Sequence, residues 1–372
     1  MTLRIAQVNC VLDRERREPE ALLAAWPTLP AVAEAIAGTG ADIVVVQASH
    51  AGARFTRRGV HYHFVPVAAA RPLAPWHMRR AVQEAAPDIT HLNGLDFPFH
   101  ARAIGRAGIP MLLQDHASRA NSHRSRLRRW GHARAAAALF TAETQAEPFL
   151  VTRQLPAGTP IFTVPESSSA FSPGNRTRAR TKTGIYGNPA ILWIGRLDAN
   201  KDPLTAIEAF RLTRARLPGA ELWCAHGTDA LLPALEQRLA GDPQLALHVH
   251  LLGQVPHAHV EQLCRACDLF LTTSHRESSG YALLEALSCG LPPVASDIAP
   301  FRAIVSDLAE SRFAAAGDAR AFAEGLISLA RQVGEQSRAA VRRHFDAQLA
   351  FPVIGRRLVD IYQAVIARSA RQ

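Results

Sequence analysis

The sequence has few lysines and few aromatic residues. Of its 42 basic residues only Lys182 and Lys201 are lysine, and aromatic side chains make up 6% of the chain. Too few rings are present for the stacking platform of a single-strand binder, and no nucleic-acid-binding motif occurs. The formal net charge of +10 still permits nucleic acid, anionic membrane or phosphorylated small molecules as partners.

The chain also lacks a long apolar run and a cysteine framework. No run approaches the about 20 residues that span a bilayer, and the first nine residues form a strand pattern with a charge at Arg4 rather than a signal peptide. The five cysteines are odd in number and scattered, as expected in a reducing compartment. Cys264-Arg-Ala-Cys267 lies on a predicted helix with no second pair and no histidine cluster nearby, which favours a structural role. We therefore expect a cytoplasmic protein.

Apolar strands alternate with helices along the whole chain, which indicates an α/β fold with parallel sheets. In the first half the predicted strands are 4–8, 41–47, 61–67, 89–92, 110–114, 137–141 and 161–164, and the helices are 18–38, 76–86 and 97–108. In the second half the strands are 190–194, 221–225, 249–252, 269–272 and 293–296, and the helices are 203–216, 230–240, 257–266, 281–289, 319–331 and 352–367.

A polar, basic stretch separates the two halves. We predict a first domain at 1–173, a linker at 174–187 and a second domain at 188–349, with a last helix at 352–370 that packs back on the first domain. Because open sheets bind ligands at the carboxyl ends of their strands, two such halves predict a ligand in the cleft between them.

The most informative motif lies between Glu277 and Glu285. A short apolar strand at 269–271 is followed by Ser278-Ser279-Gly280 and then by a helix that begins at Tyr281. The free N–H groups and the dipole of such a helix start attract a phosphate. Glu285, one turn into the helix, is placed to accept hydrogen bonds from ligand hydroxyls. A site for both a phosphate and a polyol suggests a nucleotide-sugar.

A second motif opens the second half. The strand at 190–194 ends at Gly195, and the loop after it carries Arg196 and Lys201 before a helix that starts near Pro203. Two cations on such a loop can clamp a diphosphate, the arginine through its fork and the lysine as a point charge. Each motif alone also fits ordinary surface residues, but their order along the chain is more specific.

Two further properties of these motifs bear on mechanism. Paired acids could form a hydrolase dyad, but the neighbouring cations suit a phosphate leaving group instead. No Asp-x-Asp sequence occurs in the chain, so no metal ion bridging a diphosphate is implied, and positive charge from Arg196, Lys201 and the helix start would replace it.

On these motifs the sequence resembles the retaining glycosyltransferases of the GT-B fold, family 4 type. The resemblance is strongest over about 192–299 and includes Gly195-Arg-Leu, Lys201, Glu277, Gly280, Glu285-Ala and Pro292-Pro-Val-Ala-Ser. It is weaker over the first half, at Ala86-Pro-Asp-Ile-Thr-His-Leu-Asn93, Leu112-Leu-Gln-Asp-His-Ala117 and Val164-Pro-Glu-Ser. It implies two Rossmann-like domains facing across a cleft and a hexosyltransferase that needs no cofactor beyond its nucleotide-diphosphate sugar.

The resemblance also implies roles for individual residues. Arg196 and Lys201 would bind the donor diphosphate, and Glu277 and His116 would contact the transferred sugar. Glu285 would hold the ribose hydroxyls. The remaining donor-binding candidates are Ser279, Gly280, Tyr281 and Ala282 beside the sugar and phosphate, and Val255 along the base.

The first half departs from the family pattern at two places. The turn after the first strand reads Asn9-Cys10-Val11-Leu12-Asp13 and lacks the glycines that the family often has there, which removes the usual basis for assigning contacts to this loop. Asn93 stands where a second histidine is common, and His91 fits either a core position or one that supports the site.

Several alternatives remain open. The basic stretch 119–134 fits a solvated helix face or a contact with acidic lipid heads aided by Trp130. The whole chain fits a sugar transferase, a nucleotide-sugar-binding protein that has lost catalysis, or a GT-B epimerase or phosphorylase. The acceptor, the sugar and the base are not identified by any of these motifs.

Overall fold

The computed structural model describes residues 2–67, 73–116, 118–120, 125–227, 229–305 and 307–371. The chain divides into two compact units. The first comprises Met1–Ser168 together with Phe351–Gln372, and the second comprises Ser169–Ala350. The last residues of the chain therefore belong to the same unit as the first.

The first unit is built on an eight-stranded sheet with the order β3-β4-β2-β1-β5-β6-β7-β8. All neighbouring strands are parallel except the β3–β4 pair, which is antiparallel. The strands are β1 Arg4–Asn9, β2 Asp42–Ser49, β3 Ala53–Arg57, β4 Val60–Pro66, β5 Ile89–Asn93, β6 Met111–Gln114, β7 Ala135–Phe140 and β8 Ile161–Thr163. The helices are α1 Pro19–Ala25, α2 Thr28–Ala37, α3 Ala74–Ala85, α4 Pro98–Ile104, α5 Ser125–Gly131, α6 Glu147–Val151 and α16 Phe351–Ser369, with short 3-10 turns η2 Gly105–Ala107 and η4 Glu143–Gln145.

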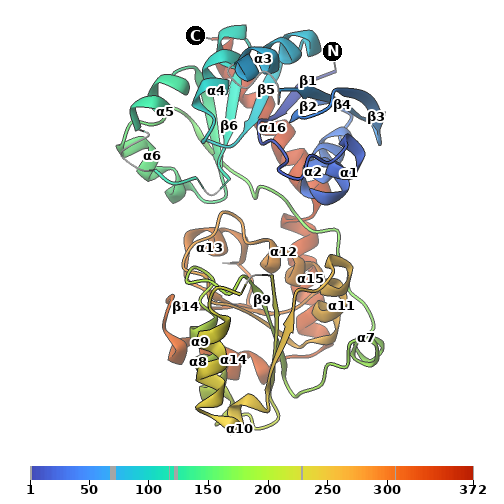
Figure 1. Cartoon of the computed structure of the whole chain (residues 1–372), viewed down its shortest axis with the longest axis vertical. Coiled ribbons are helices and arrows are strands. Elements are labelled where there is room, and N and C mark those ends of the chain that lie inside the picture. The colour runs from blue at the N-terminus through green and yellow to red at the C-terminus, as the bar shows by residue number, and fades with distance from the viewer. Residues whose placement is uncertain are drawn as a thin grey trace. The chain divides into compact units, whose positions relative to one another are not determined.

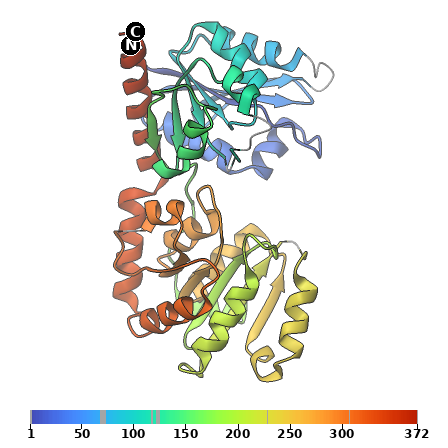
Figure 2. The ribbon, with the colours of Figure 1, turned by 90° about the vertical axis from the view of Figure 1, so that its left-hand side faces the viewer.

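Helices cover both faces of this sheet (Figure 1). One face packs against α3 and α4 through Met78, Val82 and Ile104, and the other packs against α1, α2 and α16. Figure 2 shows α16, in red, beside the strands of the first sheet. The strands are buried on both faces, which is why their sequences are continuous apolar runs rather than alternating ones.

The second unit is built on a six-stranded sheet, and every neighbouring pair in it is parallel, in the order β11-β10-β9-β12-β13-β14. The strands are β9 Ala190–Gly195, β10 Glu221–His226, β11 Val249–Gly253, β12 Leu269–Thr272, β13 Pro293–Ser296 and β14 Arg312–Ala314. The helices are α7 Arg176–Thr183, α8 Pro203–Arg214, α9 Leu232–Ala240, α10 Pro243–Ala246, α11 His257–Ala266, α12 Tyr281–Ser288, α13 Ala299–Val305, α14 Ala319–Ala330 and α15 Glu335–Gln348.

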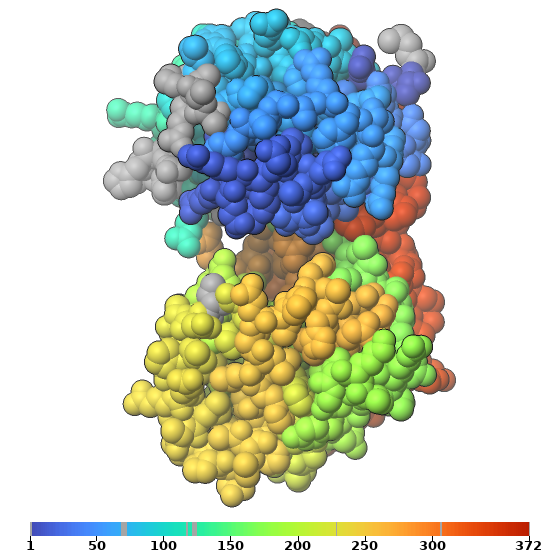
Figure 3. All heavy atoms as spheres, turned by 45° about the vertical axis from the view of Figure 1, so that its right-hand side comes forward, coloured from blue at the N-terminus to red at the C-terminus, as the bar shows by residue number. Residues whose placement is uncertain are grey.

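This sheet too is covered on both faces. One face packs against α7, α11, α12, α13 and α15, and the other against α8, α9, α10 and α14. In Figure 3 the outer surfaces of α7, in green, and α11, in orange, adjoin on the second unit, as their contacts require. Both units are therefore three-layered α/β structures, as the strand and helix pattern predicts.

The predicted helix at 18–38 is wrong in one respect, because the structure breaks it into α1 and α2. Trp26 leaves the helical region with φ −117° and ψ 65°, and Pro27 follows it as the N-cap residue just before α2. Proline disfavours a helical conformation in the residue before it. A single helix therefore could not continue through this point.

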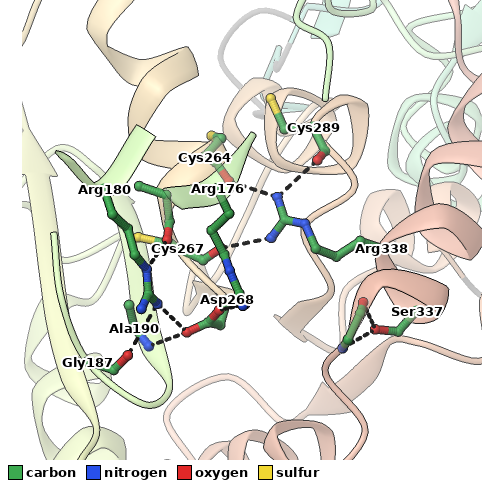
Figure 4. A network of polar contacts seen from close by, with 12 residues as sticks. Arg176, Arg180, Gly187, Ala190, Cys264, Cys267, Asp268, Cys289, Ser337 and Arg338 are labelled. Carbon is green, nitrogen blue, oxygen red and sulfur yellow. Dashed lines mark hydrogen bonds and ion pairs between the residues drawn. The ribbon is translucent and has the colours of Figure 1, made fainter. Parts of the chain in front are cut away.

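The predicted linker at 174–187 contains a helix, α7, that is part of the second unit. The side chain of Asn175 caps its start, and Gly184 ends it with φ +72°. The reason for its order is the buried carboxylate of Asp268, which accepts hydrogen bonds from Arg176 at 2.6 Å and from Arg180 at 2.8 Å (Figure 4). The basic residues that suggested a solvated linker instead anchor a helix.

A third arginine in Figure 4 binds the backbone around the cysteine motif. Arg338 of α15 donates hydrogen bonds to the carbonyl oxygens of Cys267 at 2.8 Å, Cys289 at 3.2 Å and Cys264 at 3.4 Å. All five cysteines are buried free thiols, and burial raises the pKa of Cys267 well above its ordinary value. The structural interpretation of Cys264 and Cys267 is confirmed.

Besides α7, the sequence patterns missed several short or polar elements, namely β3, α6, α10, α13, β14 and α15. None of the helices within the described ranges is both long enough and apolar enough to cross a bilayer.

Candidate functional site

In the second unit the loops after two neighbouring strands are joined to each other. β9 and β12 are adjacent and parallel, so their carboxyl ends lie at the same edge of the sheet. The Thr273 hydroxyl donates to the Lys201 carbonyl oxygen at 2.8 Å, and the His275 N–H donates to the Asn200 carbonyl oxygen at 2.8 Å. The indole N–H of the buried Trp193 in turn donates to the Thr273 hydroxyl at 3.1 Å. These bonds hold residues some seventy positions apart in one fixed arrangement.

The two motifs meet in an ion pair between the Lys201 ammonium and the Glu277 carboxylate. The lysine side chain is 20% exposed and the glutamate side chain 13%. Gly195 leaves room for the lysine stem, because an added Cβ would lie 3.3 Å from Lys201 Cγ and 2.9 Å from the Trp193 ring. A half-buried lysine and its acid partner thus lie beside the start of α12.

Arg196 lies at the start of the loop that carries Lys201, and its side chain is mostly exposed. Its guanidinium donates to the Asp198 carboxylate at 2.8 Å. Burial raises the pKa of Asp198, but the backbone N–H of Lys201 and the Arg196 guanidinium outweigh this and hold the pKa below its ordinary value. Asp198 therefore stays charged, and it fixes the loop by accepting the Lys201 N–H at 2.9 Å.

The start of α12 depends on a glycine. Gly280 precedes the helix with φ +72°, in the left-handed region that side chains rarely adopt, and an added Cβ would lie 2.4 Å from the Phe301 ring. Its N-cap residue, Gly280, has no side chain to cap the helix, whereas the neighbouring α8 is capped by its N-cap residue Asp202. The first N–H groups of a helix lack partners within it and attract anions. Of these two helix starts, α12 is the one with a glycine at its N-cap position.

Glu285, one turn into α12, has a partner that the sequence patterns did not reveal. His257, the first residue of α11, directs its Nε2 to the Glu285 Oε1 at 2.5 Å, and its ring lies against Phe171 with the centroids 4.8 Å apart. The hydrogen bond with Glu285 raises the pKa of His257. The glutamate is mostly buried while the histidine is 63% exposed, so His257 covers one carboxylate oxygen from the solvent side.

The other predicted donor-binding residues surround this helix start. Ser279 is buried and Tyr281 is exposed. Ala282 and Val255 are half-buried and pack against the same apolar core beneath α11 and α12. Val255 lies just before α11, two positions from His257. The structure thus brings together, at one edge of the second sheet, every predicted site residue except His116.

His116 lies in the first unit, just after β6. Its Nδ1 is 2.5 Å from Oε2 of the buried Glu166, and its Nε2 is 3.0 Å from the Asn93 side-chain oxygen. Asn93 in turn donates to the Asn9 side-chain oxygen at 2.7 Å. Asn9, Asn93 and His116 come from the ends of β1, β5 and β6, so a chain of polar groups crosses the carboxyl edge of this sheet. The predicted role of His116 toward a sugar stays a prediction.

Two neighbours of this array differ in character. His91 is buried within β5 and hydrogen-bonds the Tyr362 hydroxyl of α16 at 2.6 Å, and burial lowers its pKa to about 3. It is therefore a neutral core residue, which decides between the two interpretations given to it. Burial raises the pKa of Asp115 to about 6, and the negative charge of the Glu166 carboxylate contributes to this rise. Such a perturbed carboxyl beside His116 is typical of functional edges.

Within the described ranges, no group of three or more His, Cys, Asp or Glu side chains is placed to hold a metal ion. The basic stretch 119–134 is described except for residues 121–124, which lie outside the described residues. In it Arg128 is buried, not solvated, and pairs with Asp96.

Comparison with known proteins finds similar sequences for the second unit. Residues 175–343 match the family model described as glycosyl transferases group 1. The D-inositol 3-phosphate glycosyltransferase of Geodermatophilus obscurus is 32% identical over 189 residues, 48% of this chain and 41% of that protein. That of Frankia alni is 29% identical over 178 residues, 46% of this chain and 44% of that protein. The matched stretch thus spans less than half of either relative.

Solved structures match the whole chain at low identity. A glycosyltransferase from Rickettsia africae superposes with a TM-score of 0.73 at 13% identity, covering 98% of this chain and 99% of that one. Anabaena HepE in complex with UDP-glucose gives 0.65 at 16% identity, covering 97% and 100%. These likenesses establish the fold, which is the GT-B architecture of two parallel-sheet α/β units, and confirm the predicted fold class.

Proposed function

We propose, from the match of residues 175–343 to the family model described as glycosyl transferases group 1, that this protein is a glycosyltransferase. It would move a sugar from a nucleotide-diphosphate sugar to an acceptor with retention of the anomeric configuration and without a metal ion, as in the family 4 enzymes that the sequence resembles.

The observation that carries this proposal is the Lys201–Glu277 ion pair near the start of α12, whose N-cap residue is Gly280. A lysine held by a carboxylate, next to helix N–H groups, suits a ligand that carries negative charge and hydroxyls together. A diphosphate would give Lys201 a second anionic partner, and Glu277 would be left to accept hydrogen bonds from the sugar.

Glu285 and Val255 extend the proposed donor site toward the nucleoside. Glu285 would accept hydrogen bonds from the ribose hydroxyls through Oε2, the carboxylate oxygen that His257 does not contact. Val255 would lie along the base. The polar array at His116 is proposed to serve the sugar and the acceptor. Asn9 stands in it at the turn that lacks the family's glycines, so a side chain rather than bare backbone occupies this place.

In the proposed reaction the bond between the anomeric carbon and the diphosphate oxygen breaks, and the acceptor hydroxyl oxygen bonds to that carbon on the same face while its proton passes to the leaving diphosphate. Charge accumulates on the leaving diphosphate. Arg196, Lys201 and the start of α12 would stabilise this charge, which is commonly a large part of catalysis. The absence of an Asp-x-Asp sequence supports a leaving group stabilised by these cations. Turnover that is unchanged by a chelator would support independence from metal.

A thermal-shift screen of UDP, GDP and ADP tests the donor site. A nucleotide at one hundred times its Kd stabilises the protein by about 2.7 kcal/mol. UDP enters the screen first because HepE of Anabaena was solved with UDP-glucose. If no nucleoside diphosphate shifts the melting temperature, the proposal is wrong. The nucleotide-sugar that corresponds to the stabilising base is then incubated with candidate acceptors, D-inositol 3-phosphate among them because curated relatives bear its name.

The same incubation separates the alternatives. Binding without consumption of the sugar nucleotide by any acceptor would favour a nucleotide-sugar-binding protein. Conversion of the donor alone into an epimer would favour an epimerase. A transferase is expected to hydrolyse the donor slowly when no acceptor is present. With the right acceptor it should consume the donor faster and transfer the sugar.

A further inference from the structure

The first unit carries an apolar groove at a place that the proposed reaction does not use. α4 lies between α3 and α5 (Figure 1), and the groove over it has a volume of about 420 Å³. We call it the aromatic groove, and its lining residues are Pro75, Trp76, Phe99, His100, Arg102, Ala103, Arg106 and Trp130. Gly131 allows α5 to approach α4 closely, because any Cβ at this position would lie 2.4 Å from the Pro98 carbonyl oxygen.

Large aromatic side chains stand exposed at this groove in a chain that has few of them. Trp76 is 47% exposed, Phe99 55% and Trp130 43%. Phe99 and Trp130 contact each other edge to face, with ring centroids 5.6 Å apart. Exposed apolar groups gathered in one place commonly mark an interaction site. The rings stand partly open to solvent, whereas a pocket for a small molecule buries most of its ligand.

Three arginines surround the same rings without acidic partners. The Arg102 guanidinium lies 5.3 Å from the Trp130 ring centre, and that of Arg79 lies 6.0 Å from the Trp76 ring centre. Within the part of the chain that the structure describes, no carboxylate forms an ion pair with Arg79, Arg102 or Arg106. By contrast Arg54 and Arg80, elsewhere on this unit, both pair with Glu84. Positive charge around the groove is therefore uncompensated.

We propose that the aromatic groove docks the protein on an anionic lipid membrane. Tryptophan rings favour the level of the lipid headgroups, where one side is apolar and the other wet. Arginines near such a surface are attracted to its negative charge. The groove has both features on one face. Its aromatic rings suit the headgroup level, and its guanidinium groups, which have no carboxylate partner among the described residues, suit lipid phosphates. The basic stretch 119–134 contributes Trp130 to it, while the rest of the surface comes from α3 and α4.

Sedimentation of the full chain with lipid vesicles tests this docking. The wild type is expected to bind vesicles containing about 30% phosphatidylglycerol and to bind pure phosphatidylcholine far less, because the attraction is to anionic lipid. The binding is expected to weaken as salt is raised.

Two pairs of substitutions probe the two features separately. Trp76→Ala with Trp130→Ala removes the rings, and Arg102→Glu with Arg106→Glu reverses the charge. The arginine pair is expected to lower the vesicle partition coefficient at least about tenfold, since each basic residue contributes about fivefold near such a surface. The tryptophan pair is also expected to lower it, since tryptophan rings favour the headgroup level. Tyr186→Ala and Arg343→Glu, at exposed positions of the second unit, are the matched controls and should bind as the wild type does.

Melting temperatures show whether each variant is folded, and nucleoside-diphosphate binding, which these residues do not serve, should be unchanged in all of them. Equal binding of the groove variants and the controls would overturn the proposal, as would equal binding to both vesicle types. Retention of RNA that the same substitutions abolish, without vesicle binding, would identify the groove as a nucleic-acid surface and overturn it too.

Discussion

Replacing Lys201 by alanine is the sharpest test of the proposed donor site, because the change affects stability and turnover by different amounts. The variant leaves the Glu277 side chain, only 13% exposed, without its cation. Exposed pairs contribute about 0–1 kcal/mol and breaking a buried pair costs about 3–5 kcal/mol, so this intermediate burial places the cost at about 1–3 kcal/mol. For a unit of this size the melting temperature falls about 2–4 °C per kcal/mol.

The expected loss of turnover is larger than the loss of stability alone would cause. Loss of one preorganised charge donor lowers turnover by roughly 10²–10³-fold. Arg196→Ala should have an effect of the same order on turnover with little effect on melting, because its pair with Asp198 is exposed. Donor consumption under saturating nucleotide-sugar, followed by chromatography of the released nucleoside diphosphate, measures the rate.

A double variant separates the two effects of Lys201. Adding Glu277→Gln to Lys201→Ala removes the unpaired carboxylate, so the melting temperature should recover while turnover stays low. Lys182→Ala is the matched control, because Lys182 is the other lysine of the chain, exposed on α7. Near-full transfer by Lys201→Ala would refute the clamp. Restored turnover in the double variant would show that the lysine serves only to neutralise Glu277.

Three further substitutions test the start of α12 and its surroundings. Glu285→Gln should weaken nucleoside-diphosphate binding by about 10- to 100-fold, the value of a charge-assisted hydrogen bond, measured by calorimetry; unchanged affinity would remove Glu285 from the ribose site. Gly280→Ala should cost about 2–5 kcal/mol in denaturant unfolding, from its left-handed backbone and the clash with Phe301, while Gly253→Ala, also left-handed but with open space around it, should cost about 1–2 kcal/mol; equal costs would contradict the clash. Because Glu285 raises the pKa of His257 above its ordinary 6.5, the wild type should be more stable than His257→Gln below pH 6.5 and lose this advantage as the pH rises through the raised pKa; a constant difference in melting temperature from pH 5 to 9 would count against the pair.

The elements nearest the candidate site were the easiest to predict from sequence. β12, β13 and α11 have the predicted bounds, because short apolar runs bounded by glycine, proline or acidic residues leave little choice of limits. The elements that were missed lack such patterns. β3 alternates half-buried and exposed residues at the sheet edge, and α15 is mostly polar, with few apolar residues to mark a buried face.

The contacts within the site depend on the order of strands in space, which local patterns do not contain. Lys201 meets Glu277 because β9 lies beside β12 although two strands separate them in the chain. Composition likewise could not reveal that Asp268 would order α7, since the pairing joins residues about ninety positions apart. His257 has no pattern around it at all, and only its hydrogen bond to Glu285 distinguishes it from any exposed helix-start histidine.

The return of α16 to the first unit has a consequence for how the chain is made. The second unit is continuous, from Ser169 to Ala350, while the first needs both Met1–Ser168 and Phe351 onward. Domains fold as they leave the ribosome, at about 5–20 residues per second. The first unit therefore waits on the order of ten to forty seconds for Tyr362 to reach His91. During this interval the face of its sheet that α16 covers is exposed, so the unit that is synthesised first is the last to be completed.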